Sequence, residues 1–342
     1  MLISWNVTRA CNQRCLHCYR DAGVADADEL DTDESVALTG EIARAGFKIL
    51  VLSGGEPLMR QDIEALIAAA GDNGLRPVLG TNGTLLSKDV ARRLKRAGLS
   101  RAGISLDSIA PPGHDSFRGD EDAWEKGVAA MRACKDESLE FQIHTTVTRN
   151  NWKEIGEISD LAVKLGAKAH HVFFLVPTGR GCSIEEDAIT PAQVEELLRE
   201  LLKKQQGLGI EIKPVCAPQF VRIAAEIGQP TRFTQGCLAG ISYCCVLPNG
   251  DVHPCPYLPI KVGNVRETLF SQLWRKDPHF QKLRGQRYSG RCGECIHRVS
   301  CGGCRARAWA SSGDYMGEDD GCIFSQQDVR ADLRNGGEGD GA

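Results

Sequence analysis

The stretch Leu2-Ile-Ser-Trp-Asn-Val-Thr-Arg-Ala-Cys11-Asn-Gln-Arg-Cys15-Leu-His-Cys18 decides how this chain folds. An apolar, strand-like run at residues 2–7 leads directly into three cysteines with the spacing C-x3-C-x2-C. A four-iron cluster is normally held by four thiolates, so three closely spaced thiolates leave one iron without a protein ligand. An open coordination position is how a metal site admits a substrate. A zinc site with a distant fourth ligand is the alternative that the spacing leaves open.

The residues that follow alternate between strand-like and helix-like patterns. Apolar runs predict strands at residues 2–7, 48–52, 76–79, 101–106, 141–147 and 170–176. Amphipathic stretches predict helices at residues 33–45, 62–73, 88–97, 124–135 and 151–165. Because such alternation indicates βαβ units and a parallel sheet, we expect an α/β fold, a partial (β/α)6 barrel of the TIM type. A helix at 191–206 and a strand at 210–213 would add a seventh unit. The cysteine loop would then lie at the C-terminal face, where barrel active sites collect.

The bulk composition excludes several classes of protein. The 342 residues carry 41 basic and 45 acidic side chains, and a general nucleic-acid binder usually has a basic excess. No apolar run approaches the roughly 20 residues that span a bilayer. The first residues lack the basic and apolar regions of a signal peptide. We therefore expect a cytoplasmic protein that binds neither nucleic acid nor membrane.

Fifteen cysteines are the unusual feature of the composition. They gather at residues 11–18 and 237–322, and clustered cysteines in a reducing compartment favour metal ligation over disulfides. Cys134, Cys182 and Cys216 lie between the two groups and are assigned no role, because lone cysteines are usually small core residues. The second group is rich in Cys, Gly, Pro and Arg and needs metals or other staples. We expect two domains and a disordered tail, at residues 1–220, 221–330 and 331–342.

The first cysteine group, with the aromatic His17 just before Cys18, resembles the signature loop of radical S-adenosylmethionine (SAM) enzymes. The resemblance implies that Cys11, Cys15 and Cys18 are catalytic, because they hold a [4Fe–4S] cluster whose open iron binds S-adenosyl-L-methionine. It also implies that the reduced cluster cleaves SAM and that a 5′-deoxyadenosyl radical then takes a hydrogen atom from the substrate. A one-electron donor such as ferredoxin or flavodoxin would be a partner.

Polar motifs at later strand ends fit the same resemblance. Gly54-Gly55-Glu56-Pro57 resembles the GGE motif of the family, and its glycines let the backbone approach a ligand closely. Arg118 would pair with the SAM carboxylate, or else is a solvated surface arginine. The resemblance implies a set of SAM-binding residues: Gly54, Gly55, Glu56, Pro57, Thr81, Asn82, Ser105, Asp107, Arg118, Leu175 and Val176.

The second cysteine group resembles the SPASM extension found on many radical SAM enzymes. Its markers are Gly250-x4-Cys255 and the run Cys292-x2-Cys295-x5-Cys301-x2-Cys304, whose last spacing is x3 in the family. The resemblance implies one or two auxiliary [4Fe–4S] clusters, and a zinc ribbon is the alternative for paired CxxC motifs. One cluster would use Cys237, Cys244 or Cys245, Cys255 and Cys304, and the other Cys292, Cys295, Cys301 and Cys322.

Longer runs resemble a subgroup of radical SAM enzymes that tailor tetrapyrroles. These runs cover residues 2–23, 47–60, 170–181 and 301–309. The subgroup works in haem d1 synthesis and in the siroheme-dependent route to haem, where one member is 12,18-didecarboxysiroheme deacetylase. The resemblance implies a tetrapyrrole substrate whose side chains are removed or remodelled. A radical SAM peptide maturase and a non-catalytic iron–sulfur electron carrier are the alternatives.

Basic side chains near the ends of the fifth and sixth predicted strands are candidates for substrate binding. Arginine binds carboxylates bidentately, and a tetrapyrrole carries several carboxylates. A histidine could ligate the iron of the substrate, although a lone histidine in a strand is usually a hydrogen-bonded core residue. The candidates are His144, Arg149, His170, His171 and Arg180.

Overall fold

Seven parallel strands form the centre of the computed structural model, which describes residues 1–229 and 231–324. Each neighbour in the series pairs in parallel, so the expected parallel barrel sheet is confirmed and the seventh unit is part of it. The strands are β1 (Leu2–Thr8), β2 (Ile49–Gly54), β3 (Arg76–Thr81), β4 (Arg101–Ser105), β5 (Phe141–Val147), β6 (Ala169–Phe174) and β7 (Glu211–Val215). The predicted disordered tail, 331–342, lies outside the described residues.

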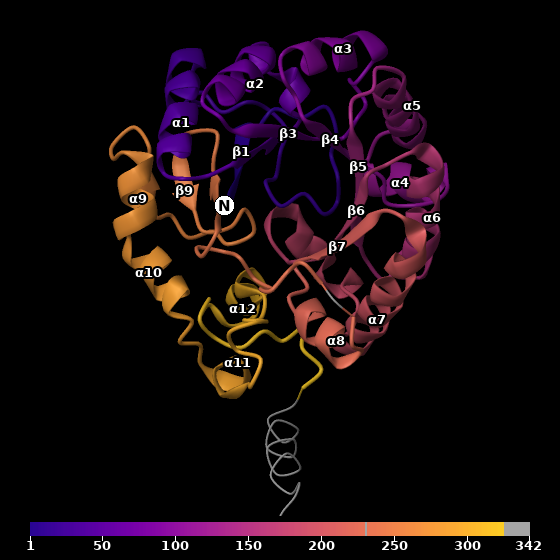
Figure 1. Ribbon diagram of the computed structural model, residues 1–342, viewed down its shortest axis with the longest axis vertical. Helices are drawn as coiled ribbons and strands as arrows, with labels where there is room; N and C mark the ends of the chain where they lie inside the picture. Colours follow the sequence, from indigo (N-terminus) through magenta and orange to yellow (C-terminus); the bar gives the residue numbers. More distant parts are fainter. Residues whose placement is uncertain (230, 325–342) are drawn as a thin grey trace, which may run out of the picture.

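Helices connect these strands and surround the sheet (Figure 1). They are α1 (Thr32–Arg44), α2 (Ile63–Asp72), α3 (Lys88–Arg96), α4 (Pro111–Arg118), α5 (Ala123–Asp136), α6 (Ile155–Leu165) and α7 (Pro191–Leu208). Helix α1 is capped by Asp31, whose carboxylate accepts from the Glu34 N–H in a capping box. Helix α4 is short and was not predicted. Short 3-10 turns lie at Pro57–Met59, Trp152–Glu154 and Gly179–Asp187.

The cysteine-rich C-terminal segment extends the same sheet. Strand β8 (Tyr243–Val246) pairs in parallel with β1, and β9 (Asp251–His253) and β10 (Gly263–Asn264) continue antiparallel beyond it. Its helices are α8 (Phe220–Glu226), α9 (Phe270–Lys276), α10 (Pro278–Gly285), α11 (Gly290–Glu294) and α12 (Arg305–Ser312). Figure 1 shows α9 and α10 on one side of the barrel and α8 beside α7. No described helix is long and apolar enough to cross a membrane.

Strand β1 has one apolar face, which packs in the main core, and one polar face, which points into the barrel. Ile3, Trp5 and Val7 are fully buried and belong to the main apolar core. Ser4 and Asn6 alternate with them and are also buried, although both are polar. Because successive side chains of a strand point to opposite faces, the polar residues face the interior of the barrel. Buried polar groups need partners, so this interior is suited to bind a polar ligand.

Candidate SAM site and iron–sulfur cluster sites

The loop that carries Cys11, Cys15 and Cys18 leaves the end of β1 and returns on itself. The Cys11 N–H donates to the Gly23 carbonyl at 2.9 Å, and the Gly23 N–H donates to the Arg9 carbonyl at 3.0 Å. Backbone N–H groups point at two of the sulfurs: Gln13 at Cys11 and Ala22 at Cys18, each at 3.4 Å. Donors aimed at sulfur stabilise thiolates, which are the form that binds metal.

The surroundings of the loop fit an iron–sulfur cluster. Burial raises the pKa of Cys11 to about 11 and also raises the pKa of Cys15, so thiolates there need a compensating cation. The ring nitrogen Nδ1 of His17 is buried without a hydrogen-bond partner among the described residues. Within residues 1–229 and 231–324, no three His, Cys, Asp or Glu side chains are arranged to hold a single metal ion. A four-iron cluster takes each thiolate on a different iron and needs no such convergence.

Gly54 and Gly55 hold the end of β2 against the start of the cysteine loop. A Cβ on Gly55 would lie 2.1 Å from the Ala10 carbonyl oxygen, and a Cβ on Gly54 would lie 2.4 Å from the Thr8 carbonyl oxygen. The Gly55 N–H donates to Thr8 and the Glu56 N–H donates to Ala10. Glycine is therefore required here because backbone meets backbone, directly before Cys11.

Glu56 connects the turn after β2 to the turn after β3. Its carboxylate is fully buried and accepts from the Leu58 N–H at 3.1 Å, the Thr81 hydroxyl at 2.8 Å and the Asn82 N–H at 2.8 Å. Burial raises the pKa of Glu56 to about 7, and these three donors oppose that rise. Glu56 therefore links the two loops, and its role as a SAM contact stays a prediction.

Asn82 extends this network to the cysteine loop. Its side-chain amide donates to the Asn12 side chain at 2.9 Å, and Asn12 donates to the Thr84 hydroxyl at 2.8 Å. Ser105, at the end of β4, is half-buried and its hydroxyl lies 3.4 Å from the Thr81 carbonyl. The predicted SAM contacts after β2, β3 and β4 therefore lie together beside the cysteines.

Asp107 and Arg118 form a buried ion pair next to Cys15. Their side chains meet at 2.6 Å, and the Arg118 guanidinium lies 3.9 Å from the Cys15 sulfur. Burial alone would raise the pKa of Asp107, but the charge of Arg118 and the neighbouring His114 hold that pKa well below its usual range. The His114 Nδ1 accepts from the Asp107 N–H at 3.0 Å. Arg118 is buried, so the alternative of a solvated surface arginine is wrong, and its pairing with the SAM carboxylate stays a prediction.

The loop after β6 packs on the cysteine loop through backbone and an arginine. A Cβ on Gly179 would lie 2.5 Å from the Cys18 carbonyl oxygen, so this approach also requires glycine. Arg180 donates to the Cys15 carbonyl at 2.9 Å and pairs with Asp21 at 2.7 Å. Arg180, a candidate for substrate binding, is therefore held by the cysteine loop, and its substrate role stays a prediction. Leu175 and Val176, in the same loop, are buried.

His144 and His171 lie side by side on the inner face of β5 and β6. They are register partners, and their rings stack with centroids 5.3 Å apart. Gln142 donates its amide to both rings, at 2.7 Å and 3.3 Å. Burial lowers the pKa of His144 to about 4. Lys213, the register partner of His171 on β7, adds a cation to this group.

The other two candidate substrate residues lie elsewhere. His170 is fully buried on the opposite face of β6, where its ring nitrogens meet Ser159 at 2.9 Å and Thr145 at 2.8 Å. It is a satisfied core histidine that packs against α6. Arg149 is exposed in the loop after β5, and its N–H donates to the Asp187 carbonyl. The sequence could not separate these residues from His144 and His171, because neither strand facing nor loop path was known.

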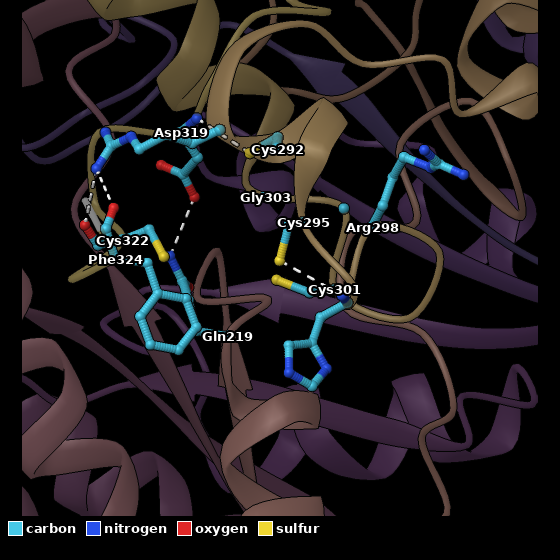
Figure 2. Close-up of a pocket in the computed structure, with 12 residues that line it drawn as sticks. Gln219, Cys292, Cys295, Arg298, Cys301, Gly303, Asp319, Cys322 and Phe324 are labelled. Atoms are coloured by element: carbon cyan, nitrogen blue, oxygen red, sulfur yellow. Dashed lines mark hydrogen bonds between the residues drawn. The ribbon is translucent and has the colours of Figure 1, made fainter. Parts of the chain in front are cut away.

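Four cysteines of the second group line one pocket near α11 and α12. They are Cys292, Cys295, Cys301 and Cys322, the set expected to hold one auxiliary cluster. Figure 2 shows them around the pocket together with Gln219 and Asp319. Arg305 points its guanidinium at the Cys292 sulfur from 3.5 Å, and the His297 N–H points at the Cys295 sulfur from 3.4 Å.

The other expected set is only partly brought together. Cys255 and Cys304 belong to one small apolar cluster, and Cys237 hydrogen-bonds through its N–H to the Cys301 carbonyl at 3.1 Å. Cys244 instead packs in the main core beside the helices, so the structure does not place it with the other three. Cys216, to which the sequence assigned no role, packs in the small cluster with Cys255 and Cys304. In the sequence, only its place just after the predicted strand at 210–213 could have marked Cys216 as a candidate site residue.

Comparison with known proteins agrees with this geometry. A family model described as the radical SAM superfamily matches residues 5–162, and one described as an iron–sulfur cluster-binding domain, SPASM, matches residues 237–296. An AdoMet-dependent heme synthase from Methanosarcina barkeri is 42% identical over 94% of this chain and 96% of its own length. One from Nitratidesulfovibrio vulgaris is 41% identical over 94% and 92%. A pre-heme d1 synthase from Dinoroseobacter shibae is 32% identical over 95% and 86%.

Solved structures share the fold. The crystal structure of Streptococcus suis SuiB bound to S-adenosylmethionine superposes with a TM-score of 0.76 at 16% identity, over 94% of this chain and 77% of that one. Such low identity indicates a common architecture only.

Proposed function

The chain belongs to the radical SAM enzymes that carry a SPASM iron–sulfur domain, and we propose that it is an AdoMet-dependent haem synthase that remodels side chains of an iron tetrapyrrole. The near-complete alignment at 41% and 42% identity with two heme synthases is the observation that carries this proposal. The pre-heme d1 synthase is 32% identical, which makes the haem d1 route the second choice. Of the two tetrapyrrole routes that the sequence predicted, we therefore propose the route to haem.

The proposed reaction follows from the structure of haem. A relative from Methanosarcina barkeri that is 31% identical is a Fe-coproporphyrin III synthase, which makes this compound a candidate precursor of haem. Fe-coproporphyrin III has four propionate side chains, and haem has two propionates and two vinyl groups in their place. Each propionate that becomes a vinyl group loses carbon dioxide, one hydrogen atom and one electron, so the step needs both hydrogen abstraction and an electron acceptor. When bound, the cluster with SAM supplies hydrogen abstraction and the auxiliary clusters supply an electron path.

The residues of this chain would perform the rest. We propose that Cys11, Cys15 and Cys18 hold the SAM-binding cluster, with the loops at Gly55, Glu56 and Gly179 fixing them at the mouth of the barrel. His144, His171 and Lys213 would bind the substrate carboxylates from inside the barrel. Lysine is a strong partner for a carboxylate, and a buried histidine N–H is a neutral donor to one.

The test is an anaerobic reaction of the reconstituted protein with SAM, dithionite and Fe-coproporphyrin III. We expect haem and 5′-deoxyadenosine to appear together by liquid chromatography and mass spectrometry. Cys15→Ala should form neither product, whereas Cys182→Ala, which changes an exposed cysteine, should form both. Conversion of 12,18-didecarboxysiroheme in place of Fe-coproporphyrin III would move the proposal to the deacetylation step. Modification of a peptide with the tetrapyrrole unchanged would contradict it.

A further inference from the structure

Cys216 lies at the seam between the barrel and the C-terminal segment. It directly follows Val215, the last residue of β7, and packs in the small apolar cluster with Cys255 and Cys304. The Cys216 thiol is an electrostatic neighbour of the Cys304 thiol. Cys304 is also an electrostatic neighbour of both Cys237 and Cys255. Four thiols from four separate segments of the chain therefore lie near one another.

The backbone holds Cys216 in an unfavourable conformation. Its φ is +61°, in the left-handed region that residues other than glycine rarely adopt. The Arg307 guanidinium donates to the Cys216 carbonyl at 3.1 Å and pairs with Asp319 at 2.7 Å. Asp319 is fully buried and accepts from the Cys304 N–H at 2.7 Å. One buried ion pair thus fixes both Cys216 and Cys304, and strain that is held in this way is typical of functional sites.

Cys244 and Cys245 on β8 were expected to supply the fourth ligand beside Cys237, Cys255 and Cys304, but they are less well placed than Cys216. Cys244 points into the main core, next to the helices. Cys245 points to the opposite face, where its sulfur accepts from the Asn6 side chain at 3.6 Å and donates to the Val246 carbonyl at 3.5 Å. Its thiol therefore already has protein partners. Cys245 is an electrostatic neighbour of Cys255, whereas Cys216 is a neighbour of both Cys255 and Cys304.

We propose that Cys216 is the fourth thiolate ligand of the auxiliary cluster held by Cys237, Cys255 and Cys304, in the place expected for Cys244 or Cys245. Four thiolates complete the usual coordination of a [4Fe–4S] cluster. The proposal depends on the SPASM auxiliary cluster and not on the identity of the tetrapyrrole. It attaches the last strand of the barrel to this cluster, whose apolar surroundings include Val176 from the loop after β6.

The test compares cysteine variants of the full-length, anaerobically reconstituted protein. Cys216→Ala should lose about four iron atoms and four sulfides per chain relative to the unchanged protein, because a cluster with one ligand removed is labile. Cys216→Ser keeps the size of the side chain and can bind iron through oxygen. It should retain more iron but change the electron paramagnetic resonance signal of one reduced cluster. Cys244→Ala and Cys245→Ala are the matched controls and should keep the iron content and the signal of the unchanged protein.

A second readout separates this proposal from the proposed function. SAM cleavage to 5′-deoxyadenosine without any tetrapyrrole reports the N-terminal cluster and should persist in the Cys216 variants. Haem formation is not scored, so a wrong tetrapyrrole leaves the result unaffected. Full iron content and an unchanged signal in both Cys216 variants, with loss in Cys244→Ala or Cys245→Ala, would overturn the proposal.

Discussion

Glu56 is the residue on which the geometry of the SAM site depends most clearly. One carboxylate oxygen accepts from Leu58 and Thr81, and the other accepts from Asn82. Glu56→Gln replaces one acceptor with an NH2 group, which leaves a buried donor facing a donor. The unfolding free energy should fall by about 1–3 kcal/mol, measured by chemical denaturation under anaerobic conditions. Glu64→Gln, which changes an exposed ion pair with Arg93, should lose far less. Equal losses in the two variants would contradict this role.

Lys213 tests the proposed binding of the substrate carboxylates. Burial lowers the pKa of its ammonium group, and its Nζ lies 4.2 Å from the centre of the Phe233 ring. Lys213→Met keeps the length of the side chain and removes the charge, so tetrapyrrole binding should weaken by roughly tenfold. Titration of the porphyrin absorption band measures this. Lys203→Met, on the exposed side of α7, should bind as the unchanged protein does. Equal affinity in both variants would place the substrate elsewhere.

His170 makes the stability sensitive to acid. Burial lowers its pKa to about 3, whereas an unfolded histidine has a pKa of about 6.5. Below pH 6.5 the unfolded chain binds a proton that the folded chain does not, so stability falls as the pH falls from 6.5 toward 3. The loss is about 1.4 kcal/mol per pH unit for this group. His170→Gln should be less stable at pH 7.5 but should lose less than the unchanged protein between pH 7.5 and 5.5. If the unfolding free energies of the variant and the unchanged protein fall equally between pH 7.5 and 5.5, His170 is not buried in its neutral form.

The histidines show where sequence reasoning ended for single residues. His170 and His171 are adjacent in the chain, yet one packs against α6 and the other faces the barrel interior. A strand predicts that neighbours point to opposite faces, but it does not say which face is inside. Cys216 was missed for a related reason: its partners follow it by 21 or more positions in the chain, and only the fold brings them together.

The turn after β2 holds the cysteine loop in place by backbone contact alone. Gly55→Ala would put a Cβ 2.1 Å from the Ala10 carbonyl oxygen, a distance that forces one of the two segments to move. Cys11 directly follows Ala10, so a shift of Ala10 would displace the cluster ligands. We therefore expect that adding SAM no longer changes the electron paramagnetic resonance spectrum of the N-terminal cluster in this variant. Gly71→Ala in α2 meets no atom within 4 Å and should be neutral or slightly stabilising. A normal SAM response in Gly55→Ala would show that the loop adapts.

The periodicity of the sequence predicted most secondary-structure elements of the barrel and fewer of those beyond it. The six expected strands are present and the seventh continues the series, because alternating apolar and amphipathic stretches are a local signal. Helix α4, which carries His114 and Arg118, contains little apolar periodicity and begins with two prolines, so no such signal existed. The pairing of β8 with β1 joins residues 239 or more positions apart, and short-range patterns carry no information on such contacts.

Because of this pairing we expect that the two halves of the chain do not fold independently. Strand β1 lies between β2 and β8, and its Leu2–Trp5 segment is in register with Tyr243–Val246. A chain ending at residue 236 would leave β1 as an edge strand, with unpaired N–H and C=O groups along a buried apolar strand. Such edges promote aggregation. We expect this truncated chain to be insoluble or aggregated in size-exclusion chromatography, whereas a chain ending at residue 330 retains every described strand and should elute as the full protein does. A soluble, monomeric 1–236 fragment would show instead that the barrel closes without its C-terminal strands.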